Sequence, residues 1–188
     1  MFDPAGPVLG IDPGLSRCGY GAVRREPGGF GPVAFGVLHT DIEAELPDRL
    51  AALEEELSRL VAELAPSSLA VERVLFQTNV RTAISVGQAS GLALAVAGRA
   101  GIPVRHYSPN EVKLAVTGSG RADKAQVQAM VQQLLELASR PPPDAADALA
   151  LALCHAWSAP HHALASAVVQ GPGLQRAVTA AIEREARA

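Results

Sequence analysis

Two short, mostly apolar segments of this chain, Val8–Asp12 and Ser68–Glu72, each end in a carboxylate. Such runs are typical of buried strands, and Pro13 and Gly14 mark a turn after the first one. Both acids are therefore expected where a buried strand ends. Glu72 is the harder acid to explain structurally, because apolar residues flank it and a lone buried charge is costly unless it is paired or metal-bound.

The remaining pattern predicts an α/β fold, with a mixed five-stranded sheet flanked by helices. Further strands are expected at residues 19–24, 32–39 and 102–107, the first two continuing the opening strand as an antiparallel meander. Leucines at alternating spacings of four and three predict a helix over residues 46–64. Other helices are expected at residues 79–99, from 108 to the glycines at 118–120, at 124–138 and at 144–157. The resulting order is β-β-β-α-β-α-β-α-α-α.

Length and composition suit one compact domain with a tail. The chain has 188 residues, of which 48% are hydrophobic. We expect a domain over residues 1–160 and a mobile, alanine-rich C-terminal tail over residues 161–188. The start of the chain does not resemble a signal peptide, and the weakly polar stretch 83–97 is too short to span a membrane. With Cys18 and Cys154 interpreted as reduced core residues, these features predict a cytoplasmic protein.

The charge distribution is compatible with a nucleic-acid partner but does not require one. A net charge of -3 argues against phosphate binding at first sight. However, eight of the nineteen acids lie between Asp41 and Glu63, whereas six Lys or Arg face three acids between Arg81 and Ser139. An acidic face and a mildly basic face can therefore coexist. Ordinary solvated charge on helices explains the same asymmetry.

Asp144 and Asp147 stand three residues apart at the start of an expected helix, so both project from one face of its first turn. A structural explanation is available, because acids in a first turn interact favourably with the helix dipole. Asp12 likewise fits ordinary turn chemistry. Together with Glu72, however, these acids form an oxygen-only ligand set that suits Mg²⁺ or Mn²⁺. Two such ions can cleave a phosphodiester, provided that the acids converge in space.

Several motifs closely resemble the RuvC family of Holliday junction resolvases. The strongest are Gly10–Gly14 with Gly19–Gly21, Ala70–Val74 and Pro143–Ala150. Asn79, Gly87–Ala89, Glu111–Lys113, Val116–Gly118 and Asp123–Gln128 also match, and the blocks follow the family's order from about Val8 to Trp157. The order and spacing of these blocks make the resemblance highly specific.

The resemblance implies a ribonuclease H-like fold and a homodimer that nicks opposite strands of a four-way junction symmetrically, in homologous recombination and DNA repair. Each cut leaves 5′-phosphate and 3′-hydroxyl ends. Asp12, Glu72, Asp144 and Asp147 are implied as metal ligands for two Mg²⁺ or Mn²⁺ ions per active site, with Asp12 bridging. For Asp144 the roles of ligand, general base and helix cap stay open. A branch-migration complex of RuvA and RuvB type is the implied protein partner.

The resemblance also implies DNA contacts. Lys113 and Lys124 are the only lysines in the chain, and they match positions that the family uses near the scissile phosphate, Lys124 as part of the catalytic set. The alternative is two ordinary surface lysines. Arg81 and Arg121 are further candidates. The family's aromatic wedge, three residues after the glutamate, is replaced here by Leu75 beside Phe76, so the apolar contact to junction bases is assigned to this pair, with a core role for Phe76 as the alternative.

Three other functions stay open. Asp12–Gly14 followed by Gly19 fits the phosphate-binding hairpin of an actin-like ATPase, although the chain is too short for two lobes and shows no second phosphate loop. A ribonuclease H-like nuclease acting on RNA would share the same acids. A catalytically silent junction binder would not need all of them.

Overall fold

The structure of the chain is a computed structural model that describes residues 6–73 and 80–169. For Arg81 and residues 159–169 it describes the main chain only. Within these ranges the elements follow the predicted order. The strands are β1 (Val8–Asp12), β2 (Arg17–Glu26), β3 (Gly29–His39), β4 (Ser68–Glu72) and β5 (Val104–Tyr107). The helices are α1 (Leu46–Leu64), α2 (Val80–Arg99), α3 (Pro109–Thr117), α4 (Lys124–Leu134) and α5 (Pro143–Val169).

The strands form one mixed sheet in the order β3-β2-β1-β4-β5. β1, β2 and β3 pair antiparallel, which confirms the predicted meander, whereas β1 pairs parallel with β4 and β4 parallel with β5. A parallel pair needs a long crossover, and α2 provides it between β4 and β5. The predicted mixed five-stranded sheet is confirmed.

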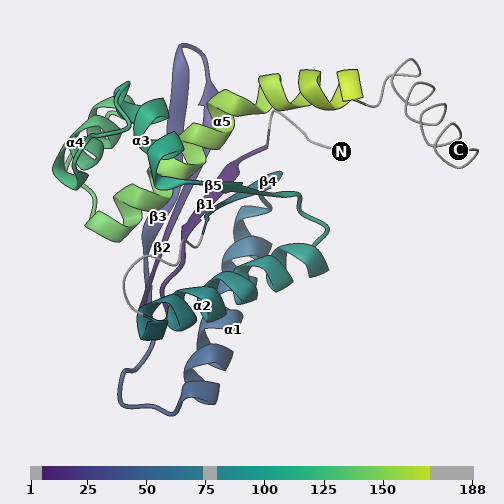
Figure 1. Ribbon diagram of the computed structural model, residues 1–188, viewed down its shortest axis with the longest axis vertical. Coiled ribbons are helices and arrows are strands. Elements are labelled where there is room, and N and C mark those ends of the chain that lie inside the picture. Colours follow the sequence, from purple (N-terminus) through teal and green to yellow (C-terminus); the bar gives the residue numbers. More distant parts are fainter. Residues whose placement is uncertain (1–5, 74–79, 170–188) are drawn as a thin grey trace, which may run out of the picture. The chain divides into compact units, whose positions relative to one another are not determined.

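Helices cover both faces of the sheet, with α1 and α2 on one side and α3, α4 and α5 on the other (Figure 1). Side chains alternate along a strand, so Leu9 and Ile11 point to one face while Gly10 and Asp12 point to the other. Leu9 and Ile11 join a core cluster with residues of α1 and α2. Gly10 instead lies against the main chain of Ala148 in α5. The carboxylate of Asp12 therefore belongs to the face that carries α5.

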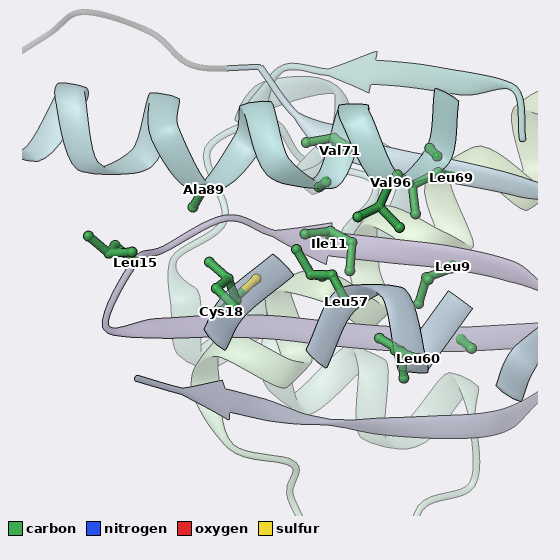
Figure 2. Close-up of a cluster of buried hydrophobic side chains, with 14 residues drawn as sticks. Leu9, Ile11, Leu15, Cys18, Leu57, Leu60, Leu69, Val71, Ala89 and Val96 are labelled. Carbon is green, nitrogen blue, oxygen red and sulfur yellow. The ribbon is translucent and has the colours of Figure 1, made fainter. Parts of the chain in front are cut away.

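The core between the sheet and helices α1 and α2 consists mainly of aliphatic side chains (Figure 2). Leu53, Leu57 and Leu60 of the predicted leucine stripe are buried in it. Cys18 and Cys154 are both buried, as predicted for core residues. Burial raises the pKa of the Cys18 thiol to about 12, so it remains a protonated, unreactive thiol at neutral pH.

On the other face, α5 lies unusually close to the sheet. A Cβ atom added at Gly10 would overlap the main chain of Ala148, and one added at Gly21 would stand 2.7 Å from the main-chain nitrogen of Leu149. These two glycines leave room for the helix backbone itself. Close packing at these two glycines therefore fixes where α5 lies on the sheet.

Two helix ends differ from the sequence prediction. α4 ends at Leu134 rather than at residue 138, because Glu136 adopts a left-handed conformation with φ 48°. α5 continues beyond the expected end at Trp157 to Val169, through a segment rich in alanine, the best helix former. α3 begins as predicted, with Ser108 and Glu111 forming a reciprocal capping box.

The chain divides into two compact units, residues 1–156 and 157–188. The predicted boundary between the domain (1–160) and the tail (161–188) stays a prediction. None of the helices in the described ranges is long and apolar enough to cross a membrane.

Candidate active site

Asp12 and Glu72 leave the sheet side by side. β1 and β4 pair in parallel with Ile11 opposite Val71, so the next residue of each strand is an acid pointing to the face that carries α5. Both side chains are partly buried. The sequence prediction of two carboxylates at strand ends is thus confirmed, and the parallel register brings them together.

The first turn of α5 brings Asp144 and Asp147 to the same edge of the sheet. Gly19 pairs with Asp12 across β1 and β2, and a Cβ atom added at Gly19 would overlap the main-chain carbonyl of Asp144. The start of α5 therefore rests directly on the strand residue opposite Asp12. Both acids of the helix are partly buried.

Lys124 completes this cluster from α4. Its Nζ donates to Oδ2 of Asp147 at 2.9 Å, and this contact raises the pKa of the lysine. The position of Lys124 is fixed by a capping box at the start of α4, in which Asp123 and Gln126 bond reciprocally. Lys124, predicted as a catalytic residue, therefore lies among the acids.

The electrostatics show that the cluster carries excess negative charge. Burial, followed by repulsion from Asp147 and Glu72, raises the pKa of Asp12 to about 7, although Lys124 opposes the shift. The pKa of Glu72 is also raised, by burial and then by Asp147, while Lys124 and Lys113 oppose it. These interactions place the acids within electrostatic reach of one another, with Lys113 near Glu72.

Arg17 also contacts the acid cluster, although it was not among the site residues predicted from the sequence. Its Nε donates to Oδ2 of Asp144 at 2.7 Å. Arg17 shares a strand face with Gly19 and Gly21, two of the glycines on which α5 rests. The alternation of side chains along β2 already places Arg17 on the same face as these glycines. It indicates a role at the acid cluster only once the position of α5 is known.

A hydrogen-bond network also holds the connection between β1 and β2. The buried Thr40 hydroxyl donates to the Leu15 carbonyl at 2.7 Å and accepts from Arg49 Nε at 3.1 Å. Arg49 Nη2 also donates to Ser16 Oγ at 2.7 Å. The segment between Asp12 and Arg17 is thus tied to the start of α1.

A family model for the crossover junction endodeoxyribonuclease RuvC matches residues 8–155. The chain belongs to the RuvC family. The RuvC protein of Salinispora arenicola is 58% identical over 152 residues, which cover 80% of this chain and 87% of that relative. That of Streptomyces griseus is 56% identical over 155 residues, covering 81% and 76% respectively.

A solved RuvC structure has the same fold. The structure of T. thermophilus RuvC in complex with a Holliday junction substrate matches with a TM-score of 0.77 and 35% identity, over 82% of this chain and 94% of that chain. The predicted ribonuclease H-like fold and the assignment to a family of junction-cleaving endonucleases are confirmed.

Membership of the RuvC family implies the use of a divalent metal ion. The donor set fits one, because it is made of carboxylate oxygens and two cations offset only part of its negative charge. As the side chains lie, however, no three His, Cys, Asp or Glu among the described residues are grouped to hold an ion. Lys124 and Arg17 bind Asp147 and Asp144, so metal binding would compete with these two ion pairs.

The other predicted RuvC site residues are placed less fully. Lys113 is partly buried in α3, and Arg121 is exposed just before α4. Leu75 and Phe76 lie outside the described residues, as does the side chain of Arg81. Their DNA contacts stay predictions.

Proposed function

We propose that this chain resolves Holliday junctions by paired, symmetric nicks, with metal-dependent hydrolysis that leaves 5′-phosphate and 3′-hydroxyl ends. The observation that carries the proposal is the meeting of Asp12, Glu72 and the first turn of α5 at one sheet edge, with Lys124 among the acids, in a chain of the RuvC family. The T. thermophilus relative was solved with a Holliday junction, which supports this substrate over RNA or a nucleotide.

We propose Asp12, Glu72, Asp144 and Asp147 as the ligands of two Mg²⁺ or Mn²⁺ ions. Such ions, when bound, orient the phosphodiester, activate water and stabilise the leaving oxygen. In addition to burial, Asp147 of α5 and Glu72 of β4 both raise the pKa of Asp12, which supports a bridging role for it. Lys124 neutralises part of the cluster and can turn from Asp147 to a substrate phosphate, since its side chain is 79% exposed.

The surrounding residues are proposed to hold DNA. Lys113 lies close enough to Glu72 to oppose the rise in that carboxyl's pKa, which supports a contact near the scissile phosphate. Arg121 is exposed just before α4, three residues before Lys124. Leu75, Phe76 and Arg81 are proposed contacts on the family resemblance alone.

We further propose a homodimer formed through α2. Val80 and Ile84 are 77% and 55% exposed on this helix. Gly87 and Gly91 continue the same stripe at helical spacing, and the space around their Cβ positions is open within 4 Å. An exposed apolar and glycine stripe of this kind allows close approach of a second helix. A Gly91→Arg protein should sediment as a monomer, whereas Gly29→Ala should leave the dimer intact.

As a cellular setting we propose the cytoplasm, where the chain would act on chromosomal DNA together with branch-migration proteins of RuvA and RuvB type. The support is the family membership and the DNA substrate of the solved relative. Co-sedimentation of the full chain with RuvA- and RuvB-bound junctions tests this partnership.

The deciding experiment compares cleavage of a synthetic four-way junction with that of a matched linear duplex and an RNA–DNA hybrid, in Mg²⁺, Mn²⁺ or EDTA. Paired symmetric nicks in the junction, lost in EDTA, are expected. Asp12→Asn should abolish cutting while junction binding persists, and Glu55→Gln, an exposed acid on α1, serves as the control. Preferential cutting of the hybrid would instead support an RNA-directed nuclease.

A further inference from the structure

Arg17 lies at the active site but has no role in the proposed function, which uses the four acids and two lysines. Its side chain is 54% exposed, and Nε lies 2.7 Å from Oδ2 of Asp144, whose side chain is 26% exposed. Across the described residues, no other hydrogen bond or ion pair of the Arg17 side chain is found. Its two terminal nitrogens carry four of the five N–H groups of a guanidinium, and none of these groups is bonded to a described residue.

A purely structural salt bridge is a poor explanation for this arginine. Exposed ion pairs contribute little to stability. The guanidinium also lies beside the first turn of α5, where the helix dipole disfavours a positive charge. The arrangement is easier to understand if the positive charge serves a ligand.

The location of Arg17 favours an anionic ligand on the substrate side of the cluster. Arg17 and Gly19 point to the same face of β2, the face on which Asp12 and the start of α5 meet. The residue just before Arg17 is held by Arg49 Nη2 through its hydroxyl, at 2.7 Å. With Nε fixed by Asp144 and the main chain held by this network, the free edge of the guanidinium is preorganised.

We propose that Arg17 is a phosphate-binding residue of the active site, which uses Nε to hold Asp144 and its terminal N–H groups to bind a backbone phosphate of the cleaved strand. A guanidinium suits this double role because its planar fork can engage a carboxylate on one edge and a phosphate on another. Lys124 lies at Asp147 and Arg17 at Asp144, so the two cations flank the acids of α5. This inference rests on the proposed function and deepens it.

The test measures binding of a synthetic four-way junction in EDTA over a range of salt concentrations, for the full chain and its variants. Arg17→Ala should weaken binding roughly tenfold and reduce the slope of log K against log salt by about one unit, as expected for one lost phosphate contact. Arg17→Lys, which keeps the charge but loses the fork, should recover most of the slope. Arg24→Ala is the matched control, since Arg24 is an exposed arginine near the opposite end of β2.

Wild-type affinity and slope for Arg17→Ala would overturn the proposal, and so would an equal loss for Arg24→Ala, which would mean a general charge effect. Circular dichroism melts check that each variant is folded. The result is separable from the proposed function: a wild-type protein that does not cut junctions contradicts that function. A wild-type protein that cuts them, while Arg17→Ala binds equally well, contradicts only the role of Arg17.

Discussion

Gly19 of β2 lies directly against the main-chain carbonyl of Asp144, leaving no room for a side chain between them. The same glycine pairs with Asp12 across the sheet. The distance between the strand carboxylate and the helix carboxylates is thus set by a residue with no side chain. This contact couples the packing of α5 to the geometry of the active site.

Gly19→Ala should therefore damage both stability and catalysis. The added methyl group must push the start of α5 away from the sheet, because the obstructing atoms belong to the backbone. Overpacking of this kind costs about 1–3 kcal/mol of unfolding free energy. Urea denaturation and single-turnover junction cleavage measure the two effects. Gly29→Ala, where an added Cβ meets nothing within 4 Å, should leave both near wild type; equal losses in the two variants would refute the explanation.

The pH dependence of stability in EDTA offers a second test. The folded-state pKa of Asp12 is about 7, against an ordinary value of 3.8, so the folded protein binds this proton more tightly than the unfolded chain. Protonation of Asp12 therefore stabilises the folded state. This stabilisation is complete below about pH 4 and is lost as the pH rises to about 7, which lowers the free energy of unfolding by at most about 4 kcal/mol. The raised pKa of Glu72 acts in the same direction. Urea denaturation from pH 4 to 8 should show this decline, and a flat profile would contradict it.

Asp12→Asn should make the metal-free protein more stable at neutral pH, although it abolishes cleavage. The substitution removes a partly buried charge that Asp147 and Glu72 repel. At pH 7.5 in EDTA, the thermal midpoint of Asp12→Asn should exceed that of wild type, and added Mg²⁺ should raise the wild-type midpoint more than that of the variant. Glu55→Gln should behave as wild type in both conditions. A lower midpoint for Asp12→Asn would show that the carboxylate stabilises the fold.

The strand ends were predictable because apolar runs stop at Asp12 and Glu72, and turn residues follow the first of them. Their meeting was implied only by the family resemblance, because it depends on the parallel register of β1 and β4, which leaves no local signal. Arg17 was missed for a similar reason: its significance comes from α5, which begins at Pro143, far along the chain. The early end of α4 reflects the left-handed conformation of Glu136, a residue type that gives no warning of it.

The buried hydroxyl of Thr40 joins Leu15 to Arg49. Thr40→Val keeps the shape of the side chain but leaves the Leu15 carbonyl and Arg49 Nε without this partner, at a cost of about 1–3 kcal/mol in unfolding free energy. The segment between Asp12 and Arg17 should then loosen, so the single-turnover cleavage rate should fall more than junction affinity does.

Thr40→Ser is the matched control, since it retains the hydroxyl and loses only a methyl group. It should preserve most of the cleavage rate, whereas Thr40→Val should not. If both variants lose rate equally, methyl packing rather than the hydrogen bonds matters at this position. If neither loses rate, the segment beside Asp12 is held by other contacts, and the network joining it to α1 has no part in positioning the active site.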